Sequence, residues 1–367
     1  MSESVTRPPA PVRLWWAQIR SVIRLEMRKT FFAKRGIWVY LLALAPAALF
    51  LADSIAVMHD RDRRADEAST HQVTREAIQQ VKMGMSRDEV EAKLGEPYSR
   101  RTFKFGRRRE THEQTMYRYT DGETDYFFSF RDDELVGRGE NELRTIPKDS
   151  LIFATVFQFF YLRLAIFFGC VGIFTNLFRG ELLDRSLHFY LLAPIRREVL
   201  LVGKYLAGLI ATVVIFTTST ALQLLAMGWH LTGPAMTEYL RGPGWGQIGA
   251  YLGVTALACL GYGSVFLAAG LLFRNPIIPA AVVLLWESAN PFLPAALKKI
   301  SVIFYLQSMC PVVARPNDMP ALAALLLSSA EATPAVWAAG GLVVVTLAVL
   351  ALAARQARKL EINYSSD

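Results

Sequence analysis

The chain has 367 residues, of which 53% are hydrophobic and 20% charged, with a net charge of +8. The charges are unevenly placed, because residues 58–149 hold 18 of the 40 Lys and Arg residues and 20 of the 32 Asp and Glu residues, a net charge of −2. The positive surplus therefore lies beside apolar stretches, which argues against a nucleic-acid-binding face, since such a face needs basic residues clustered on a folded polar surface. The distribution predicts a polytopic α-helical membrane protein that carries one polar insert.

Residues 1–36 predict a cytoplasmic amphipathic helix. Trp15, Ile19 and Val22 recur at helical spacing on one face, and Arg20 and Arg24 lie on the other. We favour a helix in the inner membrane interface, with the Trp rings at headgroup depth and the Arg side chains towards phosphates. The alternative is that this helix packs against the cytoplasmic ends of other spans, and the two arrangements can coexist.

A spanning helix needs about 20 mostly apolar residues. Five stretches meet this requirement: 37–57, 151–178, 200–227, 248–273 and 336–354. A sixth, 277–293, is shorter and contains Glu287. Two further apolar runs, 300–313 and 320–330, are too short to cross and predict re-entrant or interfacial pieces, although one could be a seventh span.

The predicted fold is therefore six transmembrane helices with a small insert. Its parts are a first span at 37–57, the insert at 58–149, spans two to six within 150–354 and a cytoplasmic tail at 355–367. Six spans place both termini on one side, and in that arrangement the short segments of one side hold 17 Lys and Arg residues against 4 on the other. Because cytoplasmic loops carry the excess of basic residues, both termini are expected in the cytoplasm and the insert outside it.

The insert predicts two helices followed by a small antiparallel sheet. Ser86 and Glu89 have capping-box spacing, so a helix should run from Ser86 to Leu94 and end at Gly95. Another helix is expected over 74–82. Strand-like runs follow Pro97, at 101–105, 115–119, 126–131 and 135–138, with a turn at Asp121-Gly122.

The segment KMGMSRDEVEAKLGEPY resembles the SmpA/OmlA (BamE-like) fold. The resemblance lies in Gly-Met-Ser, a helix and then Leu-Gly-x-Pro, and it places Gly84, Ser86, Gly95 and Pro97 in the motif. It implies an extracytoplasmic module that docks other envelope proteins. The alternative is a passive cap on the transport path.

The cytoplasmic loop between spans two and three predicts a short amphipathic helix over 180–192 that Pro194 ends. The residues alone leave two interpretations open, an ordinary charged loop or a docking element. This helix leads into Leu-Leu-x-Pro, and Arg-Arg-Glu and then Gly-Lys-Tyr-Leu-Ala-Gly follow in that order. This order resembles the permease subunit of ABC-2 type transporters, as do the amphipathic entry helix and the six spans.

The resemblance implies a bacterial inner-membrane protein in which residues 180–198 form a coupling helix on a separate ABC ATPase subunit, which would hold ATP and Mg²⁺. It also implies a second permease copy, either the same chain or a paralogue, surrounded by membrane lipid. The residues expected to contact the ATPase are Glu181, Asp184, Arg185, Arg196, Arg197 and Glu198. Lys204 is expected either to reach lipid phosphate or to contact the partner.

The chain offers no catalytic or metal-binding motif of its own. Gly203-Lys204 is followed by Tyr205 at a membrane entrance, so it cannot serve as a phosphate-binding loop, and no cofactor or metal is expected in this chain. Two charges, Arg163 and Glu287, lie about ten residues into their spans and are expected to pair, with a structural role favoured over substrate contact. An envelope scaffold that recruits partners is the alternative function, and a membrane-embedded enzyme is disfavoured.

Overall fold

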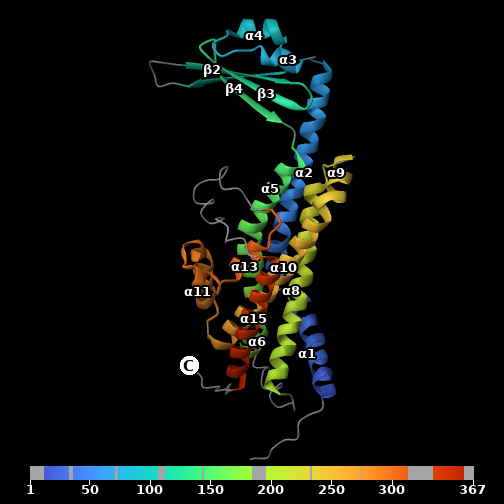
Figure 1. Ribbon diagram of the computed structural model, residues 1–367, viewed down its shortest axis with the longest axis vertical. Coiled ribbons are helices and arrows are strands. Elements are labelled where there is room, and N and C mark those ends of the chain that lie inside the picture. The colour runs from blue at the N-terminus through green and yellow to red at the C-terminus, as the bar shows by residue number, and fades with distance from the viewer. Residues whose placement is uncertain are drawn as a thin grey trace, which may run out of the picture. The chain divides into compact units, whose positions relative to one another are not determined.

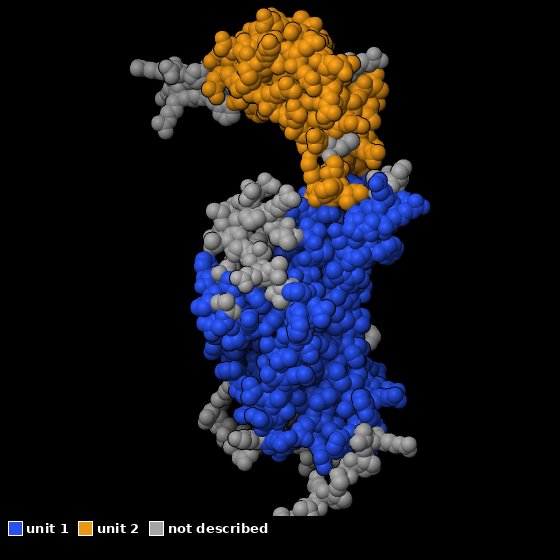
Figure 2. Space-filling model, viewed as in Figure 1, with its two compact units in different colours: residues 1–51, 150–367 blue, residues 52–149 orange. Residues whose placement is uncertain are grey.

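The computed structural model describes residues 12–32, 36–70, 73–105, 112–142, 144–183, 196–231, 234–273, 275–312 and 334–358. The chain forms two compact units, one comprising residues 1–51 and 150–367 and the other residues 52–149 (Figure 2). The first is a helix bundle, and the second contains the sheet (Figure 1).

Five helical runs in the described residues are long and apolar enough to cross a membrane. They are α2 (Ile37–Thr70), the run Ile146–Phe178, α8 (Arg197–Gly228), the run Met236–Leu272 and α15 (Ala335–Arg358). The five long apolar stretches expected from the sequence lie in these runs, except that the fourth stretch, 248–273, extends one residue past its helix. The second run comprises α5 (Ile146–Val156), the π-helical segment η2 (Phe157–Ile166) and the start of α6 (Phe167–Leu183), and the fourth comprises part of α9 (Pro234–Tyr239), η3 (Leu240–Gly244) and α10 (Trp245–Leu272).

The core of the bundle is formed where α6, α8 and α10 approach closely around the ring of Phe174. A β-carbon at Gly208 of α8 would lie 2.8 Å from that ring, and one at Gly263 of α10 would lie 2.4 Å from it. Without a hydrophobic driving force between helices in lipid, small residues of this kind let backbones approach and gain packing contacts. These glycines therefore set the spacing of the three central helices.

The sixth expected span, 277–293, differs from the prediction. Its helical part, α11 (Ile277–Ala289), has 13 residues, which is about 20 Å at about 1.5 Å per residue and short of an apolar bilayer core of about 30 Å. Pro291 lies in the 3₁₀ turn η4 (Asn290–Phe292) that follows. Because proline lacks the N–H that would continue the helix, α11 ends there.

Two short helices follow, α12 (Ala295–Lys298) and α13 (Val302–Ser308). Residues 302–306 of α13 are all buried in the bundle, where a β-carbon at Gly341 of α15 would lie 2.5 Å from the Tyr305 ring. The expectation that 300–313 is too short to cross agrees with this seven-residue helix. The run 320–330 lies outside the described residues.

The insert unit contains α3 (Arg75–Gln79), α4 (Arg87–Leu94) and a four-stranded antiparallel sheet in the order β1-β2-β3-β4. The strands are β1 (Ser99–Phe105), β2 (His112–Thr120), β3 (Thr124–Arg131) and β4 (Glu134–Glu142). Alternate residues of β2 and β3, among them Tyr117, Tyr119, Phe128 and Phe130, share a core with Val90 of α4 and other apolar helix residues. Two helices and a small sheet are thus present as expected.

Local signals set the boundaries in the insert. Ser86 caps α4 by accepting the N–H of Glu89, and the Glu89 carboxylate accepts the N–H of Ser86 at 3.1 Å, which confirms the capping box. Gly84, Gly95 and Gly122 have φ of 85°, 79° and 94°, a region that favours glycine. Gly95 ends α4, and Gly122 lies in the β2–β3 turn where Asp121-Gly122 is expected. Pro97 lies between α4 and β1.

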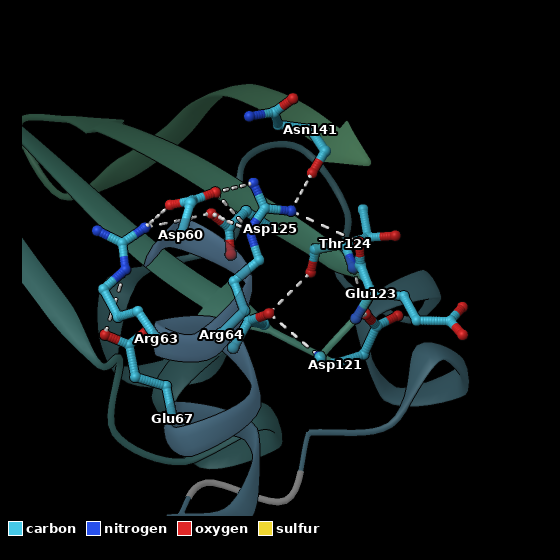
Figure 3. Close-up of polar contacts among 11 residues, drawn as sticks. Asp60, Arg63, Arg64, Glu67, Asp121, Glu123, Thr124, Asp125 and Asn141 are labelled. Atoms are coloured by element: carbon cyan, nitrogen blue, oxygen red, sulfur yellow. Dashed lines mark hydrogen bonds and ion pairs between the residues drawn. The ribbon is translucent and has the colours of Figure 1, made fainter. Parts of the chain in front are cut away.

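The first span was expected to end at Val57, but α2 continues to Thr70, and residues 52–70 belong to the insert unit. The cause is a buried polar network around Arg64 (Figure 3). Its guanidinium pairs with Asp60 at 2.6 Å and with Asp125 of β3 at 3.3 Å, and it donates to the Asn141 carbonyl of β4 at 2.9 Å. The charged residues after 57 therefore continue the helix and fasten it to the sheet.

Candidate coupling site at the start of α8

The segment expected to form the coupling helix lies only partly in the described residues. α6 continues without a break past Phe178, the expected exit from the membrane, to Leu183. Glu181 lies in its last turn. Asp184 and Arg185, with the rest of 184–195, lie outside the described residues. The start of α8, residues 196–204, is therefore the part of the predicted site that can be built from side chains.

Three predicted ATPase contacts lie at the start of α8 and have partners within the bundle. The guanidinium of Arg196 lies over the Trp15 ring, 5.0 Å from its centroid. Arg197 donates to the carbonyl of Arg358 at 2.8 Å, and the Glu198 carboxylate pairs with the guanidinium of Arg358. These contacts join α8 to α1 and α15. Arg196 and Arg197 stay exposed, so each contact is worth little energetically and leaves charge on the surface.

The N-terminal helix α1 (Val12–Phe32) packs along the start of α8 (Figure 1). Val22 is buried, and a β-carbon at Gly203 would lie 2.9 Å from its Cγ1 atom. Trp15 of α1 contacts Arg196, and Val22 of α1 contacts Gly203. From the first contact to the second, both helices advance by seven residues, so α1 and α8 run in the same direction. Packing against another span, the alternative in the sequence analysis, is therefore present, while the outer face keeps Trp16 exposed.

The sequence predicts that Lys204 reaches lipid phosphate or contacts the partner subunit, but the structure buries this side chain inside the bundle. Its side chain is 0% exposed. The ammonium donates to the Glu26 carboxylate of α1 at 2.8 Å and to the Leu177 carbonyl of α6 at 2.8 Å, and it lies 5.4 Å from the centroid of the Phe178 ring. We call this group of Lys204, Glu26 and the Leu177 carbonyl the Lys204 clamp.

The sequence held a signal for the Lys204 clamp. Glu26 is the single acidic residue of the Arg-rich helix α1, and it continues the apolar stripe of Trp15, Ile19 and Val22 at helical spacing. A lone carboxylate on a face that packs inward requires a buried cation or hydrogen-bond donors. Lys204 is that cation.

The structure brings the two intramembrane residues together through the main chain of Glu287. Arg163 of η2 is 8% exposed, and its guanidinium donates to the main-chain carbonyl of Glu287 at 3.4 Å. The Glu287 carboxylate accepts from the Ser301 hydroxyl at 2.6 Å and from the N–H groups of Val302 and Ile303 at 3.0 and 2.9 Å. Direct pairing of the two charges stays a prediction, and the carboxylate caps α13.

This cap explains how a carboxylate can lie inside the bundle. The first N–H groups of a helix have no partner within the helix and carry partial positive charge. Glu287 supplies two of them with an acceptor and fastens the end of α11 to the start of α13. Across the described ranges, no group of three or more His, Cys, Asp and Glu residues could hold a metal ion.

Comparison with known proteins agrees with this architecture. The model of the ABC-2 family transporter proteins matches residues 20–285, which include most of α1, the insert and the bundle as far as α11. No curated protein and no solved structure matches the chain. Because the family model covers well over half of the sequence, the chain belongs to the ABC-2 transporter family as a multi-pass membrane subunit.

Proposed function

We propose that the chain is the permease of an ABC exporter and receives the motion of a separate ATPase subunit at residues 180–198. ATP and Mg²⁺ would be held by that partner, and this chain would convert its closure into movement of helices. The proposed contacts are Glu181, Asp184, Arg185, Arg196, Arg197 and Glu198. One observation carries the proposal: Arg196 and Arg197 at the end of this segment contact α1 and α15, and Lys204, six residues beyond the segment, contacts α6.

A lever of this kind needs a charged outer surface and a rigid root. Arg196 and Arg197 supply exposed charge, and the Lys204 clamp lies two turns further along α8. A push on the start of α8 would therefore act on α6 through the Leu177 carbonyl and on α15 through Arg358. Movement of several helices from one docking point is what alternating access requires.

Both termini are proposed to lie in the cytoplasm, in the bacterial inner membrane, with the insert on the other side. The contact of Arg358 at the end of α15 with the start of α8 supports this, because both helices then reach the same end of the bundle. The sixth crossing would be made by the broken segment that contains α11 and α13. A second permease copy, the same chain or a paralogue, would complete the pathway, and lipid would cover the remaining apolar faces.

The insert is proposed to be a BamE-like module that docks envelope proteins. Its two helices, antiparallel sheet and capped α4 support that fold, and a passive cap is the alternative role. An envelope scaffold anchored by inert spans is disfavoured, because the family match includes the bundle.

The test is purification of the tagged full chain from native membranes, with mass spectrometry for an ATP-binding subunit and an assay of ATP hydrolysis. The double reversal Arg185→Glu/Arg197→Glu should reduce recovery of that subunit at least about tenfold, because like charges across an interface cost several kcal/mol. Arg24→Glu is the control, since it reverses an exposed charge of α1 that is not a proposed ATPase contact. Full recovery of the ATPase with the double reversal would refute the coupling assignment.

A further inference from the structure

Lys204 is a buried cation that is not among the proposed ATPase contacts. We propose that it is a positioning residue: the Lys204 clamp fastens α1 to α6 and α8, so the N-terminal helix moves with the start of α8 during transport. The inference rests on the proposed function for its last step, but the fastening itself does not. The clamp brings together residues 26, 177 and 204, which come from three different helices.

The chemistry of the clamp opposes its separation. Glu26 is 3% exposed and Lys204 is fully buried, so both charges have left water. At such depth their attraction offsets the desolvation of each only while they stay together, and without Lys204 the Glu26 carboxylate keeps Lys29 of its own helix, half-exposed and 4.0 Å away. Separation of α1 from α8 would therefore break the buried pair of Glu26 and Lys204, and this cost opposes independent movement of α1.

Two close backbone approaches flank the clamp and reinforce it. Gly203 meets Val22 of α1, and Gly208 meets Leu177 of α6, where an added β-carbon would lie 2.9 Å from the leucine side chain. The ion pair therefore lies where α8 has no side chain to separate it from either neighbour. Sliding of either helix would bring backbone against side chain.

A second contact fastens the other end of α1. Arg196 lies over Trp15, eleven residues before Glu26, so α1 is held to α8 near both ends of the contact. The outer contact is exposed and the inner one is buried. We therefore assign the mechanical role to the Lys204 clamp and treat Arg196 as a supporting contact.

The first experiment measures hydrogen–deuterium exchange of α1 in the full chain in lipid nanodiscs without the partner. Lys204→Met should raise exchange of the α1 amides around Glu26 at least about tenfold, because the buried Glu26 carboxylate loses its partner on α8. Glu26→Gln, which keeps the shape of the side chain, should raise it in the same direction if Lys204→Met does not fold. Arg24→Gln, an exposed change on the same helix, is the control and should have no effect. Unchanged protection in both clamp variants would overturn the proposal.

The second experiment separates a positioning role from a structural one. The neutral pair Glu26→Gln/Lys204→Met removes both buried charges and should restore protection of α1. In the complex with the co-purified ATPase, trapping with ATP and vanadate should change exchange in α1 and α8 together for the natural chain, but in α8 alone for the neutral pair.

A joint response that persists in the neutral pair would show that the charges serve only stability, and would overturn the positioning role. Absence of a co-purifying ATPase would refute the proposed function and not the fastening of α1, which the first experiment decides by itself. The two failures are therefore distinguishable.

Discussion

The two units each bury a cation, and they hold it in different ways. In the bundle, Lys204 has one carboxylate and one carbonyl, supplied by separate helices. In the insert, Arg64 is 3% exposed and pairs with Asp60 and Asp125 while donating to the carbonyls of Asn141 and Glu123 (Figure 3). The lysine is a point charge at a junction of helices, whereas the arginine is the centre of a network.

The difference follows from the chemistry of the two side chains. A guanidinium presents five donors in a planar fork and can bind several acceptors at once, whereas an ammonium is a compact charge on a flexible stem. The Arg64 network shares its acceptors with Arg63, which also pairs with Asp60 and lies 4.0 Å from Asp125. The arginine therefore joins one helix to two strands through several acceptors, whereas the lysine joins three helices through two acceptors.

The largest expected effect breaks the network of the insert. Arg64→Met should destabilise the insert by about 3–5 kcal/mol, because Asp125, which is 1% exposed, loses its buried partner. The change in free energy of local opening would be measured by hydrogen exchange of the β3 amides in the full chain. Arg63→Met is the matched control, because Arg63 is 38% exposed and should cost under about 1 kcal/mol. Equal costs for the two variants would mean that burial of Arg64 does not matter.

The next effect concerns the close packing on which the bundle depends. Gly270→Ala in α10 should cost about 1–3 kcal/mol, because the added β-carbon would lie 2.9 Å from the main-chain Cα of Thr175, which cannot turn away. Gly253→Ala in the same helix meets nothing within 4 Å and should be neutral or stabilise by up to about 1 kcal/mol. Thermal unfolding of the full chain in detergent, followed by Trp fluorescence, compares them. If Gly253→Ala also lowered the unfolding temperature, another surface would have to pack against that face of α10.

What could be predicted from the sequence depended on whether the signal was local. Hydropathy found the five long helices, and the spacing of Ser86 and Glu89 found the start of α4, since both signals lie within one element. The short α11 could also have been inferred from Pro291, which was included in an expected span although proline ends a helix.

Contacts between distant residues could not be predicted in this way. The Glu26 partner of Lys204 lies 178 residues away along the chain. The Glu287 carboxylate accepts from the start of α13, and hydropathy does not indicate that this helix is buried. The continuation of α2 past Val57 was missed because its charges look like a loop until Asp125 and Asn141 are placed beside Arg64. The candidate coupling site stays a prediction from position along the chain, whereas the Lys204 clamp behind it could be found only from the fold.

The smallest expected effect lies in the β3–β4 turn, a local signal that was overlooked. Asp132 and Asp133 have φ of 49° and 77°, as a two-residue hairpin turn requires. A left-handed non-glycine residue costs about 1–2 kcal/mol, and glycine loses about 0.5–1 kcal/mol of chain entropy. Asp132→Gly should therefore stabilise the insert by about 0.5–1 kcal/mol, measured by hydrogen exchange of the β4 amides.

Asp133→Gly should give a smaller gain at neutral pH, because Asp133 also pairs with Arg87 of α4. The hydrogen bond from Arg87 lowers the pKa of the Asp133 carboxyl below its ordinary value. The stability that this pair supplies is therefore present at neutral pH and is lost as the pH falls through the lowered pKa. In acid, the natural chain loses the pair as well, so the gain from Asp133→Gly should approach that from Asp132→Gly. A constant difference between the two variants from neutral to acid pH would show that Asp133 contributes through its backbone alone.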